Sequence, residues 1–234
     1  RSAPRMFSPL TNLGVSKIMK PFVHLHTHSQ YSLLNGAMSV KDVLKRVGDL
    51  GMKSVAITDE HNMFGAVDFQ LKAKKAGIKP IFGLEVKLVA DRNRIQTEDE
   101  DRIVLLAKNQ DGYGNLRELI SMGYLEGLHH GVPHVDIELI KRYGQGLIGL
   151  SGDRRSPIAR AVLGGRSEEA SEWIHTLNGS LDQLYLEVIP DETKIQSELN
   201  TLYRELGKAH NLELVATNNA YYLDTGWVSS DSTI

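Results

Sequence analysis

The feature that most constrains the fold is a regular alternation of short apolar runs with helical patterns. Most of the runs are apolar without interruption, as strands buried on both faces of a parallel sheet are. Strands that alternate with helices pair in parallel through right-handed crossovers, so an α/β architecture is predicted. The predicted strands cover residues 21–26, 53–58, 79–89, 102–107, 146–151, 183–189 and 213–217.

The predicted helices carry recognisable end signals. Ser39 is the expected N-cap of the first helix, which Gly51 ends, and Gly77 ends the second. Pro157 directly after Ser156 is the combination of an N-cap with a proline at the first helical position. The helix predicted over 193–211 presents one apolar stripe, formed by Ile195, Leu199, Leu202 and Leu206.

Seven strand–helix units predict a closed (β/α) barrel in which one unit is missing or distorted. An open doubly wound sheet is the alternative, and periodicity alone does not separate the two. No Gly/Ser-rich linker divides the chain, so we expect one domain over residues 20–223. Residues 1–19 lack periodicity and are expected to be a tail or an added leader, and residues 224–234 a peripheral tail.

Composition excludes several classes of site. The chain has no cysteine, so disulfides and thiolate metal sites are impossible, and a reducing compartment is compatible with this. The net charge of −2 shows no general preference for nucleic acid or anionic membrane. No apolar run has the length of a membrane span, so no membrane partner is expected.

Polar residues collect where the predicted strands end. In α/β folds of this kind, function gathers at the carboxyl ends of the strands. These ends read HLHTH, TDEHN, GLE, AKNQ, SGD, EVIP and ATNN. Histidines and carboxylates gathered at one rim are what a hydrolytic centre with several metals needs.

Each of these polar residues also has an ordinary structural interpretation. Alternation sends His24, His26 and His28 to one face of a strand, but a lone HxH pair is common by chance. Asp59 could cap the following helix as readily as it could serve a site. For the remaining histidines a solvated surface position is the default: His61, His129, His130, His134, His175 and His210.

Seven phrases together carry a family resemblance. HLHTHSQYSLLNG, AITDEHNMFGAVDF, AGIKPIFGLEV, LLAKNQDGYGNL, GYLEG, GLIGLSG and LVATNNAYYL occur in this order. The ordered set closely resembles the polymerase-and-histidinol-phosphatase (PHP) domain at the N-terminus of the bacterial DNA polymerase III alpha subunit. KPIFGLEV and LLAKNQDGYGNL look like the polymerase members rather than the free-standing phosphatases. The resemblance implies a distorted seven-stranded (β/α) barrel of the TIM-like PHP type, in agreement with the strand count.

The resemblance also implies up to three metals, held in active members by nine ligands. Four positions of this chain retain a usable ligand: His26, His28, Glu85 and Asp153. Independently of the resemblance, Glu85 ends an apolar strand, where a buried acid needs a partner. Asp153 could equally be a loop or helix cap.

Five ligand positions have changed, and we call them the altered positions: Asn35 and Asn219 for aspartates, and Glu60, Arg102 and Tyr221 for histidines. Of these, Glu60 could still serve as a ligand. An asparagine coordinates only through a neutral carbonyl, which weakens charge compensation for a divalent cation. The permanent charge of Arg102 opposes cation binding by several kcal/mol at close range. It is expected to pair with a carboxylate, Glu85 first and then Glu60 or Asp153. The neutral phenol of Tyr221 is a poor ligand and a good hydrogen-bond donor.

Two hypotheses about function follow. The first is a structural or interaction module, with no metal or one weakly bound Zn, Mn or Mg ion. The resemblance implies as its partners the remainder of the alpha subunit, a proofreading exonuclease subunit and, indirectly, DNA, in the cytoplasm. The nucleotidyltransferase carboxylates of the family lie in later domains, so this segment does not extend DNA. The second is a metal-dependent phosphoesterase, a 3′–5′ exonuclease or pyrophosphatase, that uses the four retained ligands.

Overall fold

The computed structural model describes residues 22–94, 101–190 and 193–223, which group into two compact units. The first unit contains residues 22–82 and 218–223, and the second contains residues 83–217. The tails expected at 1–19 and 224–234 lie outside the described residues. In the part of the chain that is described, no helix is long and apolar enough to cross a membrane.

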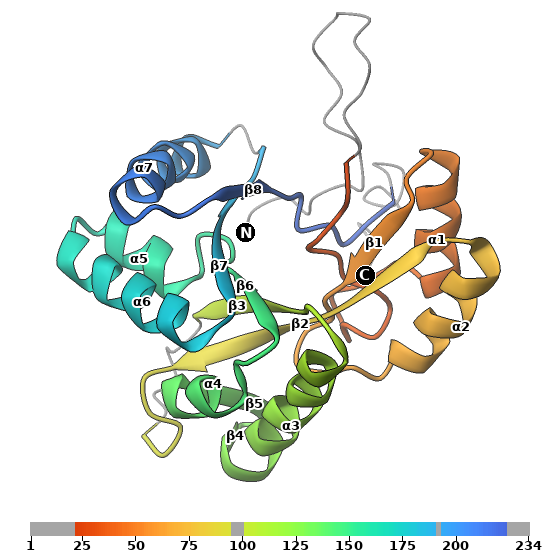
Figure 1. Ribbon diagram of the computed structural model, residues 1–234, viewed down its shortest axis with the longest axis horizontal. Helices are drawn as coiled ribbons and strands as arrows, with labels where there is room; N and C mark the ends of the chain where they lie inside the picture. Colours follow the sequence, from red (N-terminus) through yellow and green to blue (C-terminus); the bar gives the residue numbers. More distant parts are fainter. Residues whose placement is uncertain (1–21, 95–100, 191–192, 224–234) are drawn as a thin grey trace, which may run out of the picture. The chain divides into compact units, whose positions relative to one another are not determined.

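The first unit is built on the strand β1 (Ser54–Ile57) and two helices, α1 (Val40–Asp49) and α2 (Ala66–Ala76). β1 pairs in parallel with the first half of β2 (Lys79–Val89), and α1 and α2 lie side by side next to β1 (Figure 1). The apolar core between them includes Val43, Val47, Val55, Ile57 and Phe69.

The predicted helix ends at Ser39 and Gly77 are confirmed, and α1 ends at Asp49, two residues before the predicted Gly51, whose φ is 71°. The Ser39 hydroxyl accepts a hydrogen bond from the backbone nitrogen of Asp42, at 3.1 Å, as an N-cap does. Gly77 ends α2 in the left-handed conformation, with φ 68°.

The strand predicted over residues 21–26 is wrong as a regular element; residue 21 lies outside the described part of the chain. The segment makes only single parallel bridges, from His24 to Val55 and from Thr27 to Ala220. The chain bends at His26, between the two bridges, and this bend interrupts the ladder. The His24 side chain therefore does not share a face with those of His26 and His28.

The second unit contains a mixed sheet. Its strands follow the order β5-β2-β3-β6-β7-β8, and β4 pairs with β5 at the edge. The strands beyond β2 are β3 (Arg102–Ala107), β4 (Leu128–His129), β5 (Val132–Asp136), β6 (Leu147–Leu150), β7 (Gln183–Val188) and β8 (Leu214–Ala216). The β4–β5 hairpin was not predicted, because its strands are short and carry histidine and proline.

The predicted parallel pairing is confirmed for β1–β2, β6–β7 and β7–β8, and the unpredicted β5 also pairs in parallel with β2. It is wrong for β3, which is antiparallel to both β2 and β6. The sequence shows no helical pattern between Val89 and Arg102, and a strand reached without a crossover helix returns antiparallel to its predecessor.

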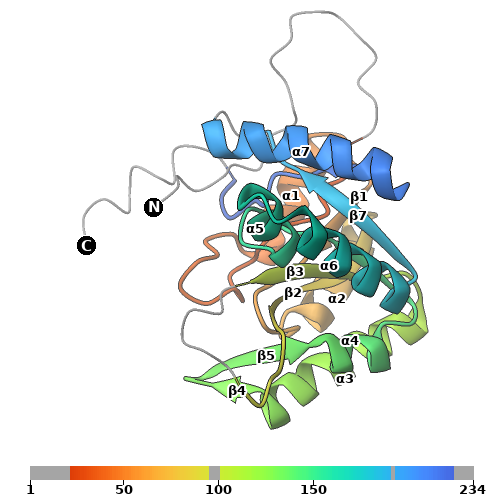
Figure 2. The ribbon, with the colours of Figure 1, turned by 90° about the vertical axis from the view of Figure 1, so that its left-hand side faces the viewer.

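Five helices complete the second unit: α3 (Gln110–Glu126), α4 (Ile137–Tyr143), α5 (Pro157–Leu163), α6 (Ser167–Ser180) and α7 (Lys194–His210). Helices α5 and α6 pack side by side, and α7 runs along β7 (Figure 2). The predicted cap at Ser156 is confirmed, since its hydroxyl accepts from the backbone nitrogen of Ala159 at 3.1 Å.

The predicted stripe on α7 is only partly right. Leu199 is buried, but Ile195 is 50% exposed. The buried face contains Gln196, Leu199, Tyr203 and Gly207. A side chain at Gly207 would collide with the Leu212 carbonyl at 2.9 Å, so the helix turns this small residue toward the chain that follows it.

Candidate metal centre

Two imidazoles of the HLHTH segment lie next to each other in the first unit. The ring centroids of His26 and His28 are 5.1 Å apart, and both side chains are buried. His24 is not part of this pair, because its ring packs edge-on against Phe22 with centroids 4.9 Å apart. Burial lowers the pKa of His24 to about 4, so this imidazole is neutral at physiological pH.

Both ring nitrogens of His28 have hydrogen-bond partners. Nδ1 lies 3.2 Å from the Ser32 hydroxyl, and Nε2 lies 3.0 Å from the side-chain oxygen of Asn219. The Ser32 hydroxyl donates its only proton to Asp59, at 2.7 Å, and the tautomer of His28 decides which of its ring nitrogens donates. Asn219 is one of the altered positions, and a cation at Nε2 would have to displace it.

Asp59 does not cap the helix that follows it. Its carboxylate accepts from the backbone nitrogen and hydroxyl of Ser29, at 2.6 and 2.7 Å, and from the Ser32 hydroxyl. The N-cap of α2 is instead Gly65, which has no side-chain cap. Asp59 thus holds the loop that follows the histidine pair, and Ser32, which sequence reasoning overlooked, links the acid to His28.

Three altered positions bind one another in the first unit. Asn35 donates its amide hydrogen to one oxygen of Glu60 at 2.9 Å, and the Tyr221 hydroxyl donates to the other at 3.0 Å. The ring of Tyr221 also stacks on His28, with centroids 4.1 Å apart and an interplanar angle of 7°. The substituted side chains therefore satisfy each other with neutral donors.

The second unit contains an ion pair between a retained ligand position, Glu85, and an altered position, Arg102. The Arg102 guanidinium donates to the Glu85 carboxylate at 2.6 Å, and the two side chains are only 13% and 2% exposed. The register explains the contact, because Arg102 lies opposite Lys87 and is thus a diagonal neighbour of Glu85 on the same face. The predicted contact between Arg102 and Glu85 is confirmed.

Asp153 binds its own loop. One carboxylate oxygen accepts from the backbone nitrogen of Arg155 at 2.9 Å, and the Arg155 guanidinium lies 3.4 Å away. This is the capping interaction that the sequence left open as an alternative to a ligand role.

The buried Glu187, on the neighbouring strand β7, accepts a hydrogen bond from the Thr217 hydroxyl.

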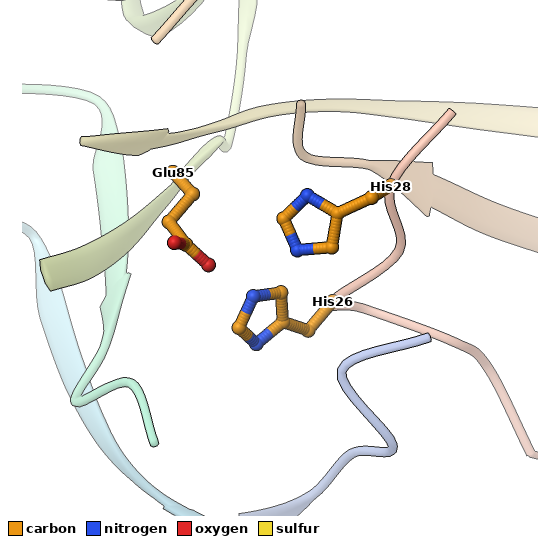
Figure 3. A group of neighbouring side chains, drawn as sticks. All are labelled: His26, His28 and Glu85. Carbon is orange, nitrogen blue, oxygen red and sulfur yellow. The ribbon is translucent and has the colours of Figure 1, made fainter. Parts of the chain in front are cut away.

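Among the described residues, the possible ligands that form a group of three are His26, His28 and Glu85 (Figure 3). The imidazoles come from the HLHTH segment and the carboxylate from β2, and Asp153 is outside the group. Two imidazoles and one carboxylate suit a single divalent ion. The side-chain oxygen of Asn219 lies against Nε2 of His28, and the Arg102 guanidinium binds Glu85.

These features define an α/β domain that carries histidines and a carboxylate as possible metal ligands. The chain belongs to the PHP domain family, whose sequence pattern matches residues 24–190. It is 36% identical over 215 residues to a DNA polymerase III subunit alpha from Borreliella burgdorferi, and 37% identical over 220 residues to the one from Helicobacter pylori. Both alignments cover 87% of this chain but only 18% of the relative's length.

Solved structures share the fold at low sequence identity. An amidohydrolase from Chromobacterium violaceum matches with a TM-score of 0.56 and 15% identity, over 86% of this chain and 87% of that one. A putative metal-dependent phosphoesterase from Bifidobacterium adolescentis matches with a TM-score of 0.54 and 13% identity, over 85% and 87%. The predicted fold class, a distorted (β/α) barrel of the PHP type, is confirmed.

Proposed function

We propose that the chain is the N-terminal PHP domain of a bacterial DNA polymerase III alpha subunit and acts there as a structural and interaction module. The observation that carries this proposal is the pairing of the altered positions. Asn35 and Tyr221 bind Glu60, Asn219 binds His28, and Arg102 binds Glu85. Ligands that had merely been lost would leave buried polar groups unsatisfied, whereas here each substitution supplies a partner.

Charge argues against a metal cluster. The guanidinium of Arg102 already neutralises Glu85 from 2.6 Å, and a divalent cation at the same carboxylate would face its permanent positive charge. Neutral amide and phenol groups at the other altered positions add no compensating charge. We expect one weakly held Zn, Mn or Mg ion at most, at His26, His28 and Glu85.

Exposed apolar side chains of the first unit support an interaction role. Phe64, just before α2, and Val67 and Leu71 within it are 65–69% exposed. Val67 and Leu71 are four residues apart and therefore share one face of α2, while Phe64 lies two residues before its first turn. Leu33 and Leu34, in the loop after the histidine pair, are exposed as well. Contiguous exposed apolar surface is typical of protein–protein contacts.

We propose that this surface contacts the remainder of the alpha subunit or a proofreading exonuclease subunit. DNA contacts and nucleotidyl transfer would belong to other parts of the subunit. A cytoplasmic location is the natural one for such a polymerase.

The second candidate function is a metal-dependent phosphoesterase that uses His26, His28, Glu85 and Asp153. It is favoured by the grouping of the first three as possible ligands. The phosphoesterase named above, as a structural neighbour, supports the fold alone.

A hydrolysis assay separates the two candidates. The chain, its His26→Ala variant and the surface variant His175→Ala would be incubated with Mn²⁺ and either single-stranded DNA or pyrophosphate. We expect no metal-stimulated turnover above background in any of them. Turnover that persists in His175→Ala and disappears in His26→Ala would replace the proposal with the phosphoesterase.

A further inference from the structure

Three of the nine histidines lie in the six-residue sequence HHGVPH, in the β4–β5 hairpin of the second unit. His130 and Gly131 form its two-residue turn, both with positive φ, 47° and 79°. Such a turn suits the right-handed twist of a tight hairpin and holds the flanking strands in register. His129 lies opposite Val132 in this register.

The register brings two of these imidazoles to one face. The backbone nitrogen of His134 donates to the carbonyl of Gly127 at 3.0 Å, which extends the pairing by two residues beyond His129. His129 and His134 are therefore diagonal neighbours, and their ring centroids are 6.2 Å apart. The ring of His130 lies 4.2 Å from that of His129.

His134 is held as a metal-ligating histidine is usually held. Its Nδ1 lies 3.3 Å from the Gly127 carbonyl, which can only accept, so Nδ1 carries the proton and Nε2 presents its lone pair. A backbone carbonyl on the second nitrogen is the common partner of a histidine ligand. Burial lowers the pKa of His134 and the charge of Lys87 lowers it further, while the hydrogen bond to Gly127 raises it.

We propose that this hairpin binds one borderline transition-metal ion, such as Zn²⁺, Ni²⁺ or Cu²⁺, through His134 with His129 and His130. The three imidazoles select these ions rather than Mg²⁺ or Mn²⁺, which prefer oxygen ligands. His134, only 3% exposed, is the fixed ligand. His130 is exposed and His129 partly so, and binding would require their side chains to rotate until their nitrogens reach the bonding distance of about 2.1 Å.

Metal titration in a suitable background tests the site. The parent is the whole chain carrying His26→Gln and His28→Gln, which removes the histidine pair of the first unit. Titration with NiCl₂ or ZnCl₂ is followed by calorimetry, and the nitrogen couplings of bound Cu²⁺ are read by electron paramagnetic resonance. We expect one ion per chain with imidazole nitrogen couplings, and at least a tenfold loss of affinity after His129→Gln/His134→Gln.

Two further variants guard the interpretation. The variant His129→Gln/His130→Gln retains the buried His134. A lower metal affinity of this variant would therefore not reflect unfolding. His175→Gln/His210→Gln removes two histidines elsewhere in the second unit and should leave the affinity unchanged. Equal weakening in this last variant, unchanged affinity in the hairpin variants, or no binding by the parent would overturn the proposal.

Discussion

The two units satisfy their altered positions in different ways. In the first unit, neutral groups are joined in a hydrogen-bonded network around Glu60 and His28. In the second unit, one permanent charge, Arg102, meets one buried acid, Glu85. Removing one neutral donor from Glu60 loses one hydrogen bond, whereas removing Arg102 from the buried ion pair leaves an uncompensated charge. We therefore expect the two units to depend unequally on single residues.

Arg102→Ala is expected to have the largest effect. Its removal strands the buried Glu85 and should lower the free energy of unfolding by about 3 to 5 kcal/mol, measured by urea denaturation. Adding Glu85→Gln should recover much of the loss, because no charge is then stranded. The control Arg94→Ala, at an arginine 87% exposed, should change stability by less than about 1 kcal/mol. Equal effects of the two arginine variants would remove the contrast between the units.

Asp59→Ala is the next largest change and tests whether the first unit also depends on an acid. The substitution leaves two hydroxyl donors and one backbone nitrogen without their acceptor. We expect a loss of about 3 kcal/mol in the free energy of unfolding, below that of Arg102→Ala. Asp68→Ala, which breaks only the exposed pair with Lys72, is the matched control and should cost about 0.5 kcal/mol.

Acid should destabilise the protein through His24. Its folded pKa, about 4, lies below the unfolded value of 6.5, so between these values the unfolded state binds a proton that the folded state does not. Stability from this group is complete above pH 6.5 and should fall by about 2 kcal/mol by pH 5. His24→Leu should flatten this slope in denaturation curves across the range; a slope as steep as before would assign the acid sensitivity elsewhere. The lowered pKa of His134 acts in the same direction and accounts for a residual slope.

Tyr221→Phe should have the smallest effect. It removes the donor to Glu60 while retaining the ring that stacks on His28. We expect a loss of about 1 kcal/mol, measurable as a small drop in Tm against the exposed control Tyr124→Phe. A loss as large as that of Arg102→Ala would show that the neutral network is no more tolerant than the ion pair.

Local patterns predicted most of the elements. The bounds of β2 and β3 agree to the residue with the predicted runs, because both runs are rich in the apolar and β-branched residues that strands favour. The caps at Ser39 and Ser156 are local hydrogen bonds and follow from neighbouring residues. The direction of β3 depends on the path of its connection, which the run itself does not encode.

The contacts of the candidate site were less accessible to sequence reasoning. The Arg102–Glu85 pair could be predicted, because a buried acid and a permanent cation constrain each other strongly. The role of Asp59 could not, since its partners Ser29 and Ser32 lie about thirty residues earlier and only the fold brings them together. For the same reason nothing in the sequence joined Asn35 and Tyr221 through Glu60.

The most direct test of the central claim, that hydrogen bonds and an ion pair have replaced the metal cluster, is to locate metals by anomalous diffraction. Crystals of the chain would be soaked in Mn²⁺ or Zn²⁺ and then washed in a mild chelator. The account predicts at most one ion, bound by His26, His28 and Glu85 at partial occupancy. In molecules without the ion, the Asn219 side chain should remain hydrogen-bonded to His28. Two or more fully occupied ions there, with Arg102 displaced from Glu85, would contradict it.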